Sequence, residues 1–211
     1  MDANQRKAYK ARIKRTLENL EKNNFKAVYV NTKDEALTLV KTLIPEGAVT
    51  AAGGSVTLRD TGILDYIKSS TDFREDYIAA YSADFYLSSA NAVTEHGEIY
   101  QVDGRSNRIS AILYGPEKVI IVAGINKLVM NVRDAVVRVK TQAAPPNAIK
   151  LSKDTPCAKR GVCVSPDCSD LHLTALGCDC DDRICCNSLI MAKQRFKDRI
   201  IVILVGEECG Y

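Results

Sequence analysis

Two runs dominated by apolar residues, KVIIVA at residues 118–123 and RIIVILV at residues 199–205, constrain the fold more than any other feature of the sequence. Such runs are typical of strands buried on both faces, as in a parallel sheet. Shorter runs of the same kind predict strands at residues 25–30, 48–52 and 85–88, and a hairpin or bent strand at residues 92–102.

Segments with apolar residues at helical spacing lie between these strands. They predict helices at residues 1–24, 34–43, 57–69, 107–113 and 130–141. Pro145 and Pro146 are expected to end the last of these helices. Strands that alternate with helices indicate an α/β fold built around a mostly parallel sheet. We therefore expect an N-terminal helix followed by one domain over residues 25–211.

The positive charge of the chain is concentrated at its N-terminus. The formal net charge is +3, whereas residues 1–26 contain eight Lys or Arg and three acids. Tyr9, Ile13 and Leu17 recur there at helical spacing, which predicts an amphipathic helix with a basic outer face. A solvated helix docked on the domain explains this charge. We do not expect nucleic-acid binding, because the basic run contains little besides this one helix.

No apolar run approaches the roughly 18 to 20 residues that a membrane-spanning helix needs. The charged N-terminus, MDANQRKAYK, also lacks the apolar core of a secretory signal. We therefore expect no membrane span and a soluble, cytoplasmic protein.

Cysteines are crowded into one segment. Seven of the eight lie between Cys157 and Cys186, and the last is Cys209. A chain of 211 residues needs no disulfides to build a core, and dense clustering in such a chain points first to a metal site. Reduced thiols, or one or two disulfides formed on oxidation, are the competing interpretations. We expect this cysteine-rich segment, residues 154–187, to be an insertion before the final strand.

Polar and glycine-rich clusters follow several of the predicted strands, where ligands bind in open α/β sheets. Each cluster could be turn chemistry alone, but their number favours one shared pocket. The candidate ligand-binding residues are Gly53, Gly54, Ser55, Thr57, Asn91, Thr94, Asp103, Asn107, Arg108, Gly124, Asn126 and Lys127. The sequence contains neither GxGxxG nor a P-loop motif, so a dinucleotide or P-loop site is not supported.

Several motifs occur in one order along nearly the whole chain: GGSVTL, NAVTEHGEI, DGRSNRI, LYGPEKVIIVAGINKLV, AAPPNAIKL, TPCAKRGVC, DRICCN and RIIVILVGEECGY. In this combination the sequence resembles the LUD-domain family, the lactate-utilisation proteins. The resemblance implies a three-layer α/β/α Rossmann-like sandwich, similar to ribose-5-phosphate isomerase, glucosamine-6-phosphate deaminase and the CoA transferases. It also implies a part in bacterial oxidation of lactate to pyruvate, beside iron–sulfur partner proteins.

Within that superfamily, residues 94–97 (TEHG) look like the Ser-Glu-x-Gly segment of class I CoA transferases, whose Glu is the acylated nucleophile. The resemblance therefore makes Glu95 a candidate nucleophile or base. The alternative is a turn carboxylate that accepts hydrogen bonds from backbone N–H groups. Lys127 and Arg108 suit a small anionic ligand such as a phosphate or carboxylate.

Family relatives with cysteines in this segment resemble TPCAKxGxC, then a third Cys, then RIC. The resemblance implies Cys157, Cys163, Cys178 and Cys185 as metal ligands. Four thiolates suit zinc or an iron–sulfur cluster. No CxxC pair is present, so the pattern is less specific than that of a zinc ribbon. Zinc is favoured because tetrahedral zinc tolerates irregular spacing. Cys168, Cys180, Cys186 and Cys209 are then surplus.

Three functions remain open from the sequence. The first is a subunit that supports oxidation of lactate or a related hydroxy acid together with iron–sulfur oxidoreductase partners. The second is a stand-alone enzyme acting on a phosphorylated or CoA-linked small molecule through Glu95. The third is a metal- or redox-sensing module that uses the cysteine segment.

Overall fold

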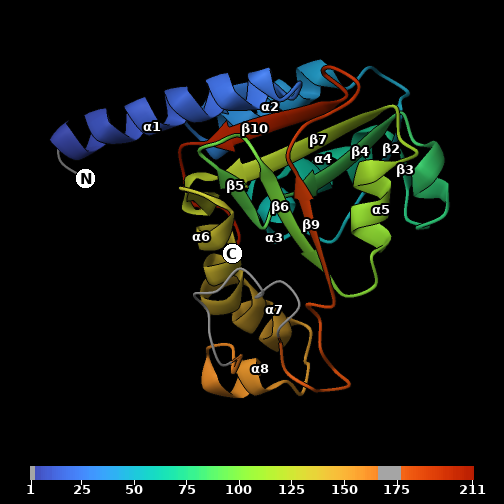
Figure 1. Cartoon of the computed structure of the whole chain (residues 1–211). Coiled ribbons are helices and arrows are strands. Elements are labelled where there is room, and N and C mark those ends of the chain that lie inside the picture. Colours follow the sequence, from blue (N-terminus) through green and yellow to red (C-terminus); the bar gives the residue numbers. More distant parts are fainter. Residues whose placement is uncertain (1–2, 166–176) are drawn as a thin grey trace.

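A computed structural model describes residues 3–165 and 177–211 of the chain, which form two sheets with helices around them (Figure 1). The larger sheet has six strands in the order β1-β10-β7-β4-β2-β3, and every neighbouring pair is parallel. Its strands are β1 (Lys26–Val30), β2 (Val49–Ala52), β3 (Asp72–Arg74), β4 (Phe85–Ser89), β7 (Lys118–Gly124) and β10 (Ile200–Val205). Only β3 lacks a counterpart among the predicted strands.

The two apolar runs form the centre of this sheet. Strand β10 pairs with β7 over its whole length, from Ile200 opposite Val119 to Val205 opposite Gly124. Alternate residues of each strand enter different apolar clusters: Val119 and Ile121 face one cluster, while Ile120 and Val122 face the other. Both faces are therefore covered, which explains why the runs carry no polar alternation.

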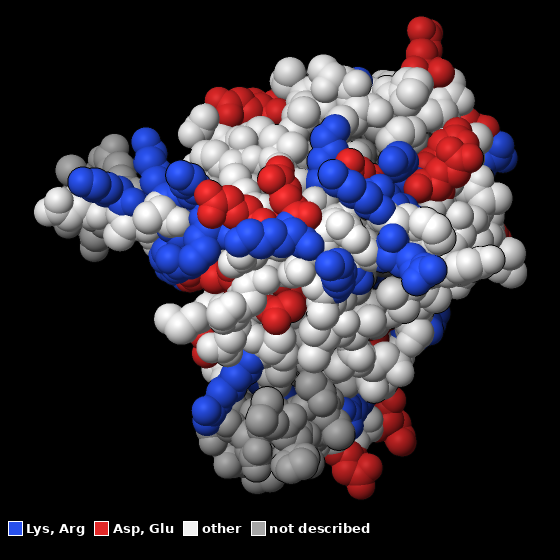
Figure 2. Space-filling model, turned by 45° about the horizontal axis from the view of Figure 1, so that its top comes forward, with Lys and Arg blue, Asp and Glu red and all other residues white. Residues whose placement is uncertain are grey.

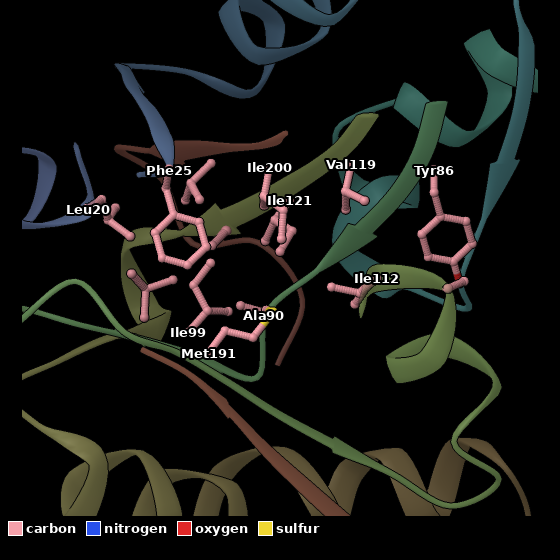
Figure 3. Packing of buried hydrophobic residues seen from close by; sticks show 14 of the residues in the cluster. Leu20, Phe25, Tyr86, Ala90, Ile99, Ile112, Val119, Ile121, Met191 and Ile200 are labelled. Carbon is pink, nitrogen blue, oxygen red and sulfur yellow. The ribbon is translucent and has the colours of Figure 1, made fainter. Parts of the chain in front are cut away.

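Helices α2 (Lys33–Leu43), α3 (Val56–Asp60) and α4 (Ile63–Ser70) supply the cluster on one face. The opposite face packs against α1 (Ala3–Lys22), α5 (Asn107–Leu113) and the smaller sheet. Figure 3 shows this second cluster, in which Leu20 and Ile112 lie with Val119 and Ile121. The expected α/β architecture, a mostly parallel central sheet flanked by helices, is confirmed.

The smaller sheet has the order β8-β5-β6-β9. Strands β5 (Ala92–Thr94) and β6 (Ile99–Asp103) are antiparallel, so the expected hairpin is present, and Gly97 provides its turn with a φ of +82°. β8 (Leu128–Val129) and β9 (Asn187–Met191) complete the sheet. β9 follows the cysteine segment and was not predicted, because most of its residues are exposed or half-buried and give no apolar run.

Two helical predictions need correction. The helix expected at residues 57–69 is broken into α3 and α4 at Gly62, whose φ of +69° interrupts the helical backbone. The helix expected to stop before Pro145 does not stop. After α6 (Val132–Arg138) the chain continues through a π-helical turn, Val139–Ala143, into α7 (Ala144–Lys150). The two prolines lie in the first turn of α7, where proline is tolerated because that N–H has no partner within the helix.

The described parts of the cysteine-rich segment contain the short helix α8 (Pro156–Arg160) and lead into β9. Cys168 lies outside the described residues. Among the helices of the described chain, none combines the length and the apolar character needed to cross a bilayer.

Candidate functional site

A pocket of about 410 Å³ opens at the carboxyl ends of the parallel strands. Residues just after β2 (Gly54, Ser55), β4 (Ala90, Asn91) and β7 (Lys127) line it. The loop from β6 to α5, the π-helical turn, α7 and the C-terminal Tyr211 also line it. Its position is the one expected for a ligand site in an open α/β sheet.

Seven of the twelve predicted ligand-binding residues line this pocket: Gly54, Ser55, Asn91, Asp103, Asn107, Arg108 and Lys127. Four of the other five support neighbouring groups. Thr57 contacts Lys127, and a Cβ on Gly53 would lie 2.7 Å from the Arg108 side chain. Asn126 bonds to the backbone of Cys209 and Gly210, and Gly124 lies against Asn126.

Thr94 is set apart from these groups: its hydroxyl bonds to the Glu98 carboxylate within the hairpin turn.

The pocket also includes residues that the sequence did not single out. Lys150 and Lys153 lie at or after the end of α7. They were not predicted, because the helix was expected to end before the prolines. Arg105 belongs to the DGRSNR cluster but was not chosen from it. Tyr77 and Tyr211 carried no recognisable local signal.

The lining of the pocket is strongly basic. Among the described residues, five basic ones, Arg105, Arg108, Lys127, Lys150 and Lys153, contribute to it, against one acid, Asp103. Lys153 also pairs with Asp182 at 3.0 Å. The lining therefore favours an anionic ligand.

Arg108 contributes its charge while its donors bind the protein. Its Nη2 donates to the Val102 carbonyl at 2.6 Å and to Asn91 Oδ1 at 3.2 Å, and its Nη1 donates to the Gln101 side chain. Burial lowers the pKa of Arg108 from its usual value. The guanidinium thus ties β6 to the loop after β4 and fixes one wall of the pocket.

Lys127 lies in the 3₁₀ turn Ile125–Lys127 directly after β7 and is only 3% exposed. Its Nζ donates to Thr57 Oγ1 at 2.8 Å and to Ser89 Oγ at 3.0 Å. Burial, together with the charges of Arg138 and Arg108, lowers the pKa of Lys127 to about 7. A large fraction of the amine is therefore uncharged at neutral pH.

Glu95 is not among the residues that line the pocket. Its carboxylate accepts a hydrogen bond from Arg12 Nε at 2.6 Å and another from the Arg15 guanidinium, both on α1. Asn19 of the same helix donates to the Glu95 carbonyl at 2.8 Å. Burial raises the pKa of Glu95, but the hydrogen bonds from Arg15 and Arg12 outweigh it, so the pKa lies below its usual value.

Figure 2 shows Lys and Arg side chains along α1, the arm that projects from the body of the protein. Through Arg12 and Arg15, part of this basic surface is used to hold α1 against the hairpin turn. The partners of Glu95 are therefore guanidinium groups, whereas the turn interpretation expected backbone N–H groups. Its role as nucleophile or base stays a prediction.

A second, smaller cavity of about 30 Å³ lies beside the pocket. All four predicted metal ligands, Cys157, Cys163, Cys178 and Cys185, line it. Lys140, from the π-helical turn, also lines it and donates to Ser165 Oγ at 3.1 Å. Burial raises the pKa of Cys178, and the neighbouring Cys185, Cys180 and Cys157 add to this effect.

The seven cysteines in the described part of the chain are all free thiols. Cys180 and Cys186 donate to the carbonyls of Asp154 and Arg183, and Cys209 is buried beside Glu207. Across residues 3–165 and 177–211, no three His, Cys, Asp or Glu side chains already stand in an arrangement that could hold a metal ion. The four predicted ligands thus share a cavity without closing into a coordination sphere.

The two cavities have a common wall. Val102, Val139, Ala144 and Cys185 line both of them. Val139 belongs to the π-helical turn, a feature that often marks functional sites. The cysteine segment therefore helps to shape the pocket at the strand ends.

A family model, the LUD domain, matches residues 13–205 of the sequence. The chain belongs to the LUD-domain family. The match begins within α1 and covers all four predicted metal ligands, the whole lining of the smaller cavity and the lining of the pocket except Tyr211. Membership supports a role related to lactate utilisation.

Solved structures similar to this LUD-domain protein include a DUF162 family protein from Deinococcus radiodurans, with 14% identity, a TM-score of 0.49 and coverage of 95% of this chain and 97% of that one. Another is the ribose 5-phosphate isomerase from Plasmodium falciparum, with 16% identity, a TM-score of 0.32 and coverage of 47% and 52%. No curated protein matches the sequence.

Proposed function

We propose that this LUD-domain protein supports the oxidation of lactate or a related hydroxy acid by binding a small anionic ligand in the pocket at the strand ends. The observation that carries the proposal is the lining of this pocket, to which residues 3–165 and 177–211 contribute five basic side chains and one acidic one. A ligand carboxylate would gain charge-assisted hydrogen bonds there. Lys150 and Arg105 are the basic groups best suited to reach it, because Arg108 is engaged by protein acceptors.

The size of the pocket favours a second candidate function. Its volume of about 410 Å³ falls in the range of sites for larger ligands, and lactate would fill only part of it. A phosphorylated or CoA-linked small molecule would use more of the space and the same basic residues. In this function Glu95 acts as nucleophile or base only if α1 releases it from Arg12 and Arg15.

We also propose that the four cysteines hold a zinc ion. Their convergence on one cavity supports this, and tetrahedral zinc tolerates the irregular spacing of the four cysteines better than an iron–sulfur cluster does. Zinc requires the sulfurs to close to about 2.3 Å from the ion, so binding would draw the cysteine segment inward.

A zinc ion held by four cysteines has no open coordination position and performs no redox chemistry, so the site would be structural and would fix Cys185 in the shared wall. The electrons released when a hydroxy acid is oxidised would then pass to separate iron–sulfur oxidoreductase partners. This division of roles is consistent with a binding subunit in a larger system.

Two measurements test these proposals. Metal analysis of protein purified anaerobically should find about one zinc per chain and no visible iron–sulfur absorbance. A colourless, metal-free and folded protein would contradict the metal site.

Thermal shifts with lactate, pyruvate, sugar phosphates and CoA esters test the pocket. Ligand stabilisation should be weaker in Lys150→Met than in Lys193→Met, because Lys193 is exposed and lies outside the pocket lining. Equal shifts in the two variants would contradict the proposed site.

A further inference from the structure

Anion binding alone does not account for the environment of Lys127. A charged amine that is 3% exposed normally has a carboxylate partner. Among the ion pairs of residues 3–165 and 177–211, none involves Lys127. Two hydroxyl groups, those of Thr57 and Ser89, contact its Nζ instead.

The hydrogen bonds around Lys127 have a defined direction. Thr57 Oγ1 donates its proton to the Cys209 carbonyl at 3.0 Å, so it accepts from Lys127. Ser89 Oγ accepts the second N–H of the amine. An uncharged amine has two N–H groups and one lone pair. The two hydroxyls use both N–H groups, and the lone pair keeps no partner in the part of the chain that the structure describes.

Titratable groups from four elements surround the amine. Arg138 of α6 and Arg108 of α5 oppose its protonation, while Asp60 of α3 and Cys209 of the C-terminal segment favour it. Together with burial, the net effect is the pKa of about 7. A lysine that is desolvated and placed near other cations is an activated nucleophile.

We propose that Lys127 is a catalytic amine that forms an imine with the carbonyl group of an anionic ligand, a 2-oxo acid being the simplest. This rests on the proposed function, because the pocket must first bind the anion. It also connects with that function chemically, since removing two electrons and two protons from a 2-hydroxy acid gives a 2-oxo acid.

The step balances as follows. The lone pair of Nζ attacks the carbonyl carbon and a C–N bond forms. The carbonyl oxygen takes up the two amine protons and leaves as water, and the C=N bond remains. No oxidant or reductant is consumed. The hydroxyls of Thr57 and Ser89, which hold the amine, are positioned to relay these protons.

Reductive trapping tests the imine. The full-length protein is incubated with pyruvate and sodium cyanoborohydride, and the adduct is located by intact mass and peptide mapping. We expect one adduct per chain, on Lys127. Lactate, which has no carbonyl group, should give none. Lys127→Arg should lose the adduct, and Lys193→Met should keep it.

Peptide mapping of the wild-type protein gives the answer even if a Lys127 variant fails to fold. An adduct on Lys150, or adducts spread over exposed lysines, would overturn the proposal. A parallel calorimetric titration with pyruvate distinguishes failure of the imine proposal from failure of the proposed binding function. Saturable pyruvate binding without an adduct on Lys127 overturns the imine and leaves the proposed function standing, whereas an absence of both overturns both.

Discussion

The contacts of Glu95 give a sharp expectation for the substitution Glu95→Gln. The Glu95 side chain is 5% exposed, and it bonds to Arg12 and Arg15, whose side chains are 33% and 56% exposed. A hydrogen bond to a charged group contributes about 1.5–3 kcal/mol when buried. Because the two arginines reach solvent and Gln keeps one acceptor oxygen, we discount this to a loss of about 1–2 kcal/mol in the free energy of unfolding.

The assay is urea unfolding followed by far-UV circular dichroism, because the chain contains no Trp. Glu18→Gln is the matched control: it removes an α1 carboxylate that is 54% exposed and 3.9 Å from Lys14, and its effect should be near zero. Glu95→Gln should unfold at lower urea than both the wild type and this control.

The pH dependence adds a second test. The pKa of Glu95 is lower in the folded protein than its ordinary value of 4.5. Its contribution to stability is therefore complete above the pKa of the unfolded state and is lost as the pH falls through the folded pKa. The stability difference between wild type and Glu95→Gln should stay constant near neutral pH and shrink in acid. Equal stability of the two proteins at neutral pH, together with loss of a measured turnover, would refute the structural role and support the nucleophile.

Three further expectations concern the turn, the cysteines and the amine. Gly97→Ala should lower the free energy of unfolding by about 2–4 kcal/mol, because its φ is +82° and the new Cβ would lie 2.5 Å from the Asn19 backbone. The control Gly161→Ala, at a position with positive φ but open space, should lower it by only about 1 kcal/mol. Equal losses for the two variants in urea unfolding would exclude a tight contact at Gly97. Cys163→Ser should reduce the zinc content measured by mass spectrometry, whereas Cys186→Ser should not; unchanged zinc in both would remove Cys163 from the ligand set. The rate of pyruvate trapping should rise as the pH passes through the Lys127 pKa of about 7 and then level off; a rate that keeps rising steeply toward the usual lysine range would mean that the amine is not activated.

The central sheet could be predicted because its signal is local. KVIIVA and RIIVILV are buried on both faces, and each became a full-length central strand. β9 has no such signal, since it forms an edge of the smaller sheet and only Met191 within it is buried. The predicted helix end before Pro145 was wrong for a related reason. A proline usually ends a helix unless it lies in the first turn, and the π-helical turn before Pro145 places both prolines in the first turn of α7.

The candidate site was predictable in part for the same reason. Clusters after β2, β4 and β7 meet because parallel strands place their carboxyl ends at one edge of the sheet. Lys150 and Lys153 reach the pocket through the continued helix, which the sequence did not indicate. The pairing of Glu95 with Arg12 and Arg15 joins residues about eighty positions apart, and no local pattern reports such a contact.

Calorimetric titration of the wild-type and Lys150→Met proteins with pyruvate tests most directly whether the basic pocket binds a small anion. We expect saturable binding at one site per chain. We also expect Lys150→Met to bind about fivefold more weakly, since an exposed charge contributes about 1 kcal/mol, and Lys193→Met to bind as the wild type does. An absence of saturable binding, or equal affinity in all three proteins, would contradict the assignment of this pocket.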